Sequence, residues 1–183
     1  LEISCVFTDL AGFTTLMESA EPTVVLPVLN QYLDGMCTIV RDKGGTIDKI
    51  VGDALHVFFG APLEIPDHAE RAVDCALAMD AYAREFEQSE AARSVAFGGT
   101  RIGVHTGLAL VGNFGGDTFF DYTAHGDTVN TAARMESVNS HLGTRLCVSG
   151  ETAKACKTIQ FRPVGALVLK GKSQPVEAFE PVS

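Results

Sequence analysis

Hydrophobic positions follow two different periods in the first part of the chain. Residues 2–8 are mostly apolar and predict a buried strand. From Leu16 to about Val40, apolar residues recur at helical spacing and predict a long helix. Pro22 suits the start of this helix, whereas Pro27 implies that its regular part begins late or is kinked. Gly44–Gly45 is expected to end it.

The next segments predict a hairpin and a second amphipathic helix. Thr46–Val51 and Ala54–Phe59 are strand-like runs on either side of Gly52–Asp53, a pair typical of tight hairpin turns. Asp67, with Glu70 three residues later, indicates a capping box at the start of a helix. The apolar stripe of that helix consists of Ala69, Ala72, Val73, Ala76, Met79, Ala83 and Phe86.

The second half of the chain alternates shorter elements. Thr100–His105 and Leu108–Val111 predict two strands joined by a turn at Thr106–Gly107. Asp127 is expected to cap a helix that runs through Glu136, and a short helix is expected near Glu151–Lys157. Helices separated by paired strands predict an α+β sandwich, with helices packed on a mainly antiparallel sheet.

Composition indicates one well-cored domain with a negative net charge. The 183 residues are 46% hydrophobic, and no repeat or low-complexity linker divides them, so we expect a single domain over residues 1–183. The net charge of −9 argues against nucleic acid as a partner, although local cations and a metal ion can still hold a nucleotide.

Five scattered cysteines without CxxC spacing predict buried thiols in a reducing, cytoplasmic compartment. No apolar run reaches the length of a membrane span. The chain opens directly on a strand, so we expect a fragment of a longer protein with regulatory domains, either soluble or membrane-anchored.

Two aspartates are candidate metal ligands. Asp9 ends the first strand before a glycine-containing turn and a helix, which places a carboxylate beside backbone N–H groups that suit phosphates. Asp53 lies at the tip of the predicted hairpin. Each has a structural alternative, since Asp9 would serve as a helix N-cap and Asp53 as a turn residue paired with Lys49. Together they would complete a Mg²⁺ site.

A second group of polar residues suits phosphoryl chemistry. Asn130 and Arg134 are four apart on a predicted helix and share a face, although asparagine is a poor residue in a helix interior. An amide beside a guanidinium suits a phosphorus centre whose charge grows in the transition state. Arg101 and Lys170 are weaker candidates, and His125 is interpreted as a packed or solvated histidine rather than a base.

Taken together, these motifs resemble the catalytic domain of the class III adenylate and guanylate cyclases, from Phe7 to about Phe179. The resemblance implies a ferredoxin-like βαββαβ core with a C-terminal extension, and a wreath-like homodimer with its active sites at the interface. It also implies conversion of ATP to 3′,5′-cyclic AMP and pyrophosphate with two Mg²⁺ (or Mn²⁺) ions per site.

The resemblance divides the site residues between two protomers. On the metal side, it assigns Asp9, Asp53 and the Leu10 carbonyl to the metals. The turn Ala11–Thr14, with Gly12, Phe13 and Thr14, would face the β- and γ-phosphates, and Arg101 would bind phosphate. On the base side, it assigns Lys49 and Thr123 to adenine, Asn130 and Arg134 to the transition state, and Lys170 to the triphosphate.

Thr123 is a departure from the pattern of many adenylate cyclases, which have aspartate there. Threonine at this position resembles the class IIIb subgroup, which includes bicarbonate-responsive cyclases, and its hydroxyl can accept from the adenine amino group. Guanylate cyclases carry a glutamate–cysteine pair for guanine, so Lys49 with Thr123 favours ATP.

Three other functions on related folds are alternatives to this prediction. A catalytically silent, nucleotide-binding regulatory domain would lack metal aspartates or the Asn/Arg pair, and this chain has all of them. A guanylate cyclase remains an alternative, because it would differ from an adenylate cyclase mainly in the purine base that it binds. A diguanylate cyclase would need a Gly-Gly-Asp/Glu-Glu-Phe signature, which the sequence does not contain.

Overall fold

A computed structural model describes residues 1–113, 115, 122–168 and 173–182. The elements follow one another in this order: β1 (Glu2–Leu10), α1 (Phe13–Ser19), α2 (Pro22–Asp42), β2 (Thr46–Val51), β3 (Ala54–Phe59), α3 (His68–Glu87), α4 (Glu90–Ser94), β4 (Thr100–Leu108), β5 (Leu110–Asn113), β6 (Tyr122–His125), α5 (Asp127–Ser137), α6 (Asn139–Leu142), β7 (Leu146–Ser149), α7 (Gly150–Ala155), β8 (Gln160–Leu167) and β9 (Val176–Val182).

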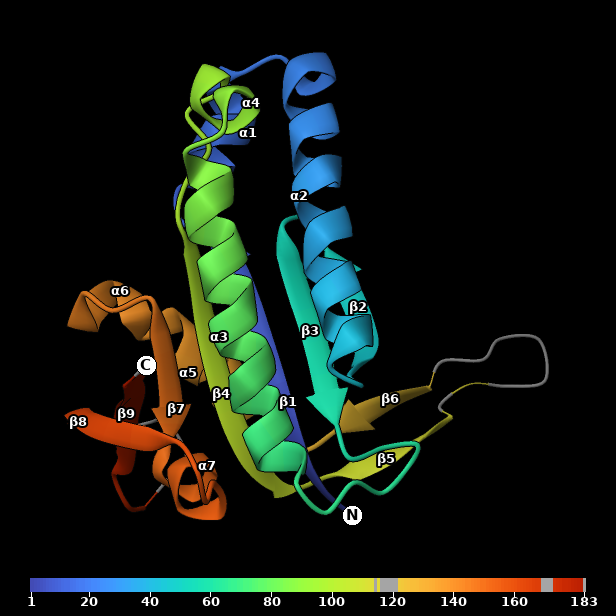
Figure 1. Ribbon diagram of the computed structural model, residues 1–183, viewed down its shortest axis with the longest axis vertical. Coiled ribbons are helices and arrows are strands. Elements are labelled where there is room, and N and C mark those ends of the chain that lie inside the picture. Colours follow the sequence, from blue (N-terminus) through green and yellow to red (C-terminus); the bar gives the residue numbers. More distant parts are fainter. Residues whose placement is uncertain (114, 116–121, 169–172, 183) are drawn as a thin grey trace.

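The main sheet has seven strands in the order β2-β3-β1-β4-β7-β9-β8. Its pairings are antiparallel except for β4 with β7. The first part, β1-α2-β2-β3-α3-β4, is a ferredoxin-like βαββαβ unit, and β7–β9 extend the sheet at its β4 edge. The α+β prediction is therefore confirmed. A separate ribbon of β5 and β6 projects from the lower end of the sheet (Figure 1).

Helices cover both faces of the sheet because β1 is apolar on both sides. Val6 and Leu10 point to the core under α2 and α3, whereas Ile3, Cys5 and Phe7 point to a second core under α5 and β6. Side chains alternate along a strand, so Asp9 lies on the same face as Phe7. The alternation thus brings Asp9 to the α5 side of the sheet.

Several predicted elements have the expected bounds. The hairpin strands Thr46–Val51 and Ala54–Phe59 are β2 and β3, and they pair in antiparallel fashion. The stripe predicted for α3 is buried throughout. Pro22 starts α2 as expected, but the helical run predicted from Leu16 is interrupted at Ala20 and Glu21, between α1 and α2. Because α2 begins at Pro22 and continues through Pro27, the alternative of a late start is wrong.

The predicted turn at Thr106–Gly107 is also wrong. Strand β4 continues through both residues and pairs with β1 as far as Glu2 opposite Leu108. The glycine has a packing reason, since a Cβ on Gly107 would lie 2.6 Å from Thr128 Oγ1 of α5. A glycine in a strand lets a helix approach closely because it has no side chain. The sequence alone does not distinguish such a glycine from one in a turn.

The capping residues differ from the prediction for two helices. Asp67 is the N-cap of α3 but makes no side-chain cap bond, and it pairs with Arg71 at 3.0 Å instead. Glu70 accepts from the backbone N–H of Thr158, 2.7 Å away, and so fastens α3 to the C-terminal extension. For α5 the N-cap is Gly126, and Asp127 is the first helical residue.

By length and composition α2 resembles a membrane-spanning helix. In this fold it is a core helix, because its buried residues, among them Tyr32 and Met36, pack in the cluster that it shares with α3 and the sheet. All five cysteines have free thiols, four of them buried, as the sequence predicted.

Gly103 on β4 sets how closely α5 approaches the sheet. A Cβ at this position would lie 2.1 Å from the Glu136 backbone nitrogen and 2.5 Å from the Met135 carbonyl carbon, and neither backbone can move alone. We expect Gly103→Ala to lower the free energy of unfolding by about 1–3 kcal/mol, measured by urea denaturation.

Gly112 on β5 is the matched control, because among the described residues no atom beyond its two chain neighbours lies within 4 Å of a Cβ placed there. Gly112→Ala should change stability by less than about 0.5 kcal/mol. Equal losses in the two variants would contradict this account of the α5–β4 contact.

Candidate functional site

Asp9 and Asp53 converge at one end of the central strands. Asp9 pairs in register with Arg101 of β4, whose guanidinium donates to both carboxylate oxygens at 3.0 and 3.2 Å. Asp53, in the β2–β3 turn, accepts a 2.7 Å hydrogen bond from the Leu10 backbone N–H. Burial, with the nearby Asp9 charge, raises the pKa of Asp53 despite that hydrogen bond. The two carboxylates therefore share one small, partly buried region.

The turn after β1 presents backbone groups beside these carboxylates. Gly12 has φ +72°, a left-handed conformation that glycine adopts without strain, and it is the N-cap of α1. Phe13 and Thr14 form the first turn of that helix. Gly98 fits against the turn, since a Cβ there would lie 2.0 Å from the Ala11 carbonyl oxygen. Asp9 itself lies within β1, so its interpretation as a helix N-cap is wrong.

Glu136 of α5 is a third acid at this end, which the sequence analysis missed. Its Oε2 is buried and lies 3.9 Å from Arg101 Nε, and no donor among the described residues makes a hydrogen bond to it. When protonated, Glu136 can itself donate a hydrogen bond to Asp9. Burial, together with the Asp9 carboxylate, raises the pKa of Glu136 to about 8. Arg101 opposes this shift only weakly because Asp9 already engages its charge. Glu136 is therefore largely protonated at neutral pH in the metal-free protein.

Stability without metal should depend on pH through Glu136. The folded protein holds this proton more tightly than the unfolded chain, so the group favours folding below its ordinary pKa of about 4.5. That contribution is lost as pH rises from there through about 8. In thermal denaturation with EDTA, the melting temperature of Glu136→Gln should rise relative to that of the original protein between pH 5 and pH 9. Exposed Glu85→Gln is the control, and a constant difference for Glu136→Gln would contradict the prediction.

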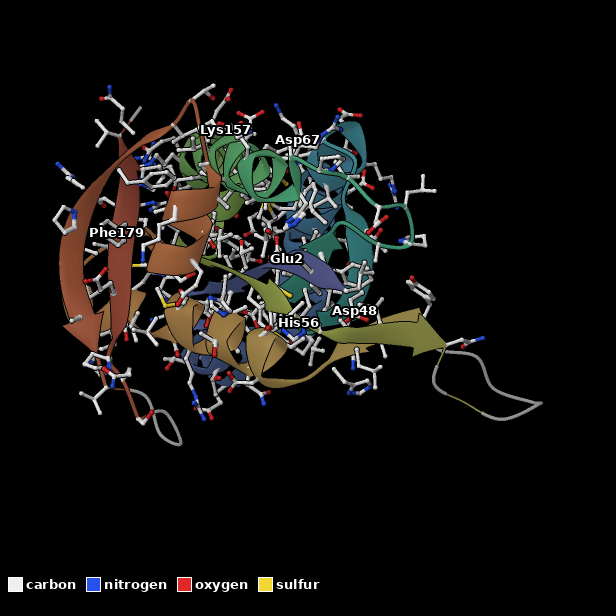
Figure 2. The ribbon with its side chains drawn as sticks, turned by 90° about the horizontal axis from the view of Figure 1, so that it is seen from below. Glu2, Asp48, His56, Asp67, Lys157 and Phe179 are labelled. Atoms are coloured by element: carbon white, nitrogen blue, oxygen red, sulfur yellow. The ribbon has the colours of Figure 1, made fainter. Side chains whose placement is uncertain are left out.

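A groove of about 400 Å³ lies on the same face of the sheet, between the β2–β3 hairpin and α5. Strands β1, β2 and β3 contribute its floor, and β6 and α5 contribute its far wall. Its lining residues are Phe7, Asp48, Lys49, Val51, His56, Ala124, His125, Gly126, Val129, Asn130 and Ala133. Figure 2 shows Asp48 and His56 near each other on the side of the molecule where β6 runs. Lys49 and Asn130, predicted separately from sequence, meet in this groove.

The remaining predicted residues lie around the groove in different ways. Arg134 is half-buried one helical turn after Asn130 on α5. Thr123 of β6 is 1% exposed, and its hydroxyl oxygen has no hydrogen-bond partner in the described part of the chain. It is not among the groove's lining residues. Lys170 lies outside the described residues.

Residues 1–179 match the profile of the family described as "Adenylate and Guanylate cyclase catalytic domain". The chain belongs to this family, the class III nucleotide cyclases. It is 37% identical to Adenylate cyclase 1 of Rhizobium meliloti (strain 1021) over 99% of its length, and 27% identical to an adenylate cyclase of Anabaena cylindrica over 97%. It spans 27% and 36% of these two relatives.

Solved structures of cyclase domains have the same fold. The adenylyl cyclase CyaB from P. aeruginosa superposes with a TM-score of 0.87 at 36% identity, covering 100% of this chain and 94% of that one. The guanylyl cyclase Cya2 superposes with a TM-score of 0.88 at 31% identity, covering 99% and 91%. The ferredoxin-like core with its C-terminal extension is therefore the class III cyclase fold.

Cyclases of this family use divalent metal, and the residues of this chain fit one. Asp9 and Asp53 supply hard oxygen donors on neighbouring segments. Burial and, to a smaller extent, the Asp9 charge raise the pKa of Asp53, and a bound cation would offset both effects. Within the described residues no three His, Cys, Asp or Glu side chains form a metal cage. Such a cation would complete its coordination with phosphate oxygens and water, as Mg²⁺ commonly does.

Proposed function

We propose that this chain converts ATP to 3′,5′-cyclic AMP and pyrophosphate as a homodimer. The observation that carries the proposal is that Asp9, Asp53 and Arg101 are not among the residues that line the groove. Asp53 faces Leu10 and the Asp9–Arg101 pair, whereas Lys49, on the same hairpin, lines the groove with Asn130. In a two-fold dimer, a second copy would bring its metal-binding residues to the groove of the first and so complete a nucleotide site.

The exposed surface beside the groove supports a second copy. Ile50 and Val51 of β2 are 49% and 58% exposed, and Leu110 and Tyr122 of the β5–β6 ribbon are 66% and 40% exposed. Large apolar side chains gathered at the edge of a functional groove are typical of a surface that another chain covers. A two-fold homodimer would have two equivalent sites, each with its metal side from one protomer and its base side from the other.

The chain's residues then have the following roles in the reaction. The ribose 3′-oxygen attacks the α-phosphorus, its proton leaves to solvent, and the bond from the α-phosphorus to the bridging oxygen breaks to release pyrophosphate. Asn130 orients the ribose, and Arg134 stabilises the charge that develops on the α-phosphoryl group. Arg101, the turn Ala11–Thr14 and Lys170 hold the β- and γ-phosphates.

Two Mg²⁺ (or Mn²⁺) ions, held by Asp9, Asp53 and the Leu10 carbonyl, would supply Lewis-acid activation of the 3′-hydroxyl and neutralise the leaving group. Arg101 now occupies both oxygens of Asp9. We infer that it transfers to phosphate when substrate binds, since a guanidinium pairs with either anion. Residues 1–183 act as one catalytic domain in this scheme, and its free thiols fit a reducing, cytoplasmic compartment.

Base choice has a second candidate, because the similar Cya2 structure is that of a guanylyl cyclase. We favour ATP because Lys49 is present and the glutamate–cysteine pair that binds guanine in guanylate cyclases is not. The Thr123 position suggests the class IIIb subgroup. Cyclase assays at fixed pH, with and without bicarbonate, test that assignment, and no change on adding bicarbonate would count against it.

The proposal is tested by measuring cyclic nucleotide formed from ATP and from GTP, in Mg²⁺ or Mn²⁺, across protein concentrations. We expect cyclic AMP as the main product and a specific activity that rises with concentration as dimers form. Nucleotide binding without turnover in Mn²⁺ would instead indicate a silent regulatory domain. Specific activity independent of concentration, with a monomer at all concentrations, would contradict the shared site.

A further inference from the structure

We propose that Arg145, through its ion pair with Glu87, is a positioning residue for the turn Ala11–Thr14 that receives the phosphates. This inference rests on the proposed function and specifies what holds that turn in place. Arg145 directly precedes β7, and Glu87 is the last residue of α3. The pair acts through residues 97–100, the segment that leads into β4.

Residues 97–100 lie directly behind the phosphate-binding turn. The Ala11 backbone N–H donates to the Gly99 carbonyl at 2.8 Å, which extends the pairing of β1 with β4 by one residue. A Cβ on Gly98 would lie 2.0 Å from the Ala11 carbonyl oxygen, so the two backbones are in close contact. A shift of this segment therefore displaces the backbone that faces the phosphates.

Two side chains fix the ends of this segment in the core. Phe97 is buried, and its ring centroid lies 5.1 Å from that of Tyr32. The Thr100 hydroxyl oxygen lies 2.7 Å from the Tyr32 hydroxyl oxygen, and the two groups share a hydrogen bond. The two glycines between these anchors have no side chains, so neighbouring groups must hold them.

The Glu87–Arg145 pair supplies this support at Gly99. A Cβ on Gly99 would lie 2.8 Å from Glu87 Oε1 and 3.2 Å from Arg145 Nη1, so the ion pair packs against the glycine backbone. Arg145 Nη1 donates to both Glu87 oxygens, at 3.1 and 3.3 Å, and Arg145 Nε donates to Asp80 at 2.9 Å. The three side chains are only 15–28% exposed, so salt screens these contacts less than it screens surface pairs.

The backbone of Arg145 is also fixed, because its carbonyl accepts from the Ile102 N–H of β4 at 2.8 Å. The guanidinium reaches from there to the end of α3, at the end of the molecule where α1 also lies (Figure 1). Without it, Asp80 would keep Arg84 at 2.9 Å, but Glu87 would lose the cation that holds it against the segment. A half-buried carboxylate that loses its partner is costly and favours solvent.

The direct test is hydrogen–deuterium exchange at the Ala11 N–H, which requires neither metal nor turnover. In Arg145→Ala this amide should exchange roughly 10-fold faster than in the original protein, because the turn opens more easily once its support is lost. Arg84→Ala is the matched control, since it removes another arginine from Asp80 and leaves the Glu87 contact in place. Its exchange at Ala11 should be unchanged.

Two results of this exchange experiment would overturn the proposal. One is equal protection of Ala11 in Arg145→Ala and in the original protein. The other is faster exchange in Arg145→Ala that is shared equally by the amides of the β2–β3 hairpin, because it would indicate lower global stability rather than a released turn.

The catalytic test follows from the place of the turn. A misplacement of about 1 Å at a substrate-binding group can cost roughly 10²-fold in rate. We expect Arg145→Ala to lower kcat/KM for ATP by roughly 10- to 100-fold. The double variant Glu87→Ala/Arg145→Ala should lose no more, because Arg145 acts through Glu87. Losses from the two single variants that multiply in the double variant would contradict this.

Mixed dimers distinguish positioning from a general loss of fold. Arg145 supports the metal side of its own chain, so Arg145→Ala mixed with Lys49→Ala should recover about a quarter of the original activity. Arg145→Ala mixed with Asp53→Ala should recover nothing beyond the residual activity of Arg145→Ala. If Lys49→Ala and Asp53→Ala complement each other but neither complements Arg145→Ala, Arg145 serves folding or dimerisation only, and the proposal is wrong.

Failure of the proposed function has a different signature. If the original protein forms no cyclic nucleotide, or if Lys49→Ala and Asp53→Ala do not complement each other, the homodimeric cyclase is refuted. Exchange at Ala11 then still decides whether Arg145 holds the turn. If the protein is active and Arg145→Ala matches Arg84→Ala in exchange and in kcat/KM, the positioning role alone is refuted.

Discussion

Homodimers of Lys49→Ala and of Asp53→Ala should each be nearly inactive, whereas an equimolar mixture of the two should recover about a quarter of the original activity. In a mixed dimer both lesions fall into the same site, and the other site keeps Asp53 from one chain and Lys49 from its partner. Random exchange makes about half of the dimers mixed, and each has one working site of two. The measurement is cyclic AMP formation after the two variants are unfolded and refolded together.

The matched control pairs two lesions from the same side of the site. Asp9→Ala mixed with Asp53→Ala should recover nothing, because each chain contributes its metal-binding residues as a unit. Every site in that mixed dimer still lacks one aspartate. Recovery in the control mixture, or its absence with Lys49→Ala and Asp53→Ala, would show that the sites are not divided in this way.

Arg134→Ala should lower kcat by roughly 10²- to 10³-fold while changing KM for ATP only a few-fold. A guanidinium that meets the α-phosphoryl group mainly when charge develops contributes to the transition state and little to ground-state binding. Lys49→Ala should show the opposite pattern, with a larger rise in KM, because the contact with the base is present before and during reaction. Steady-state kinetics with saturating metal distinguishes the two patterns.

Arg84→Ala is the control for loss of a helical arginine. Arg84 is an exposed residue of α3 and pairs with Asp80 at 2.9 Å, so its removal should leave kcat and KM unchanged. A rise in KM without a fall in kcat for Arg134→Ala would assign that residue to substrate binding instead.

Local sequence signals were sufficient where neighbouring residues decide the structure. The β2–β3 hairpin has the predicted bounds because Gly52 adopts φ +61° in a tight turn between two strand-forming runs. The buried stripe of α3 followed from its period alone. Asp9 and Asp53 were likewise identified from their places at a strand end and a turn, and the fold brings them together through Leu10.

Contacts between distant segments were not visible in the sequence. Gly107 indicated a turn, but it is needed for the approach of Thr128 from α5. Glu70 indicated a helix cap, but it binds the backbone at Thr158, 88 residues away. Glycine and acidic residues serve local and long-range purposes alike, and a single sequence does not say which applies at a given position.

The sequence by itself determined the fold class, the family and the identity of most candidate site residues, because these depend on periodicity and on short motifs in a fixed order. Only the tertiary structure decided how those residues are grouped. It brought Glu136 to the Asp9–Arg101 pair because α5 packs directly on Gly103. It turned Asp48 into the groove through a one-residue bulge and kept Thr123 out of the groove's lining. Burial, register and close approach arise from pairing segments far apart in the chain, which a local pattern does not encode.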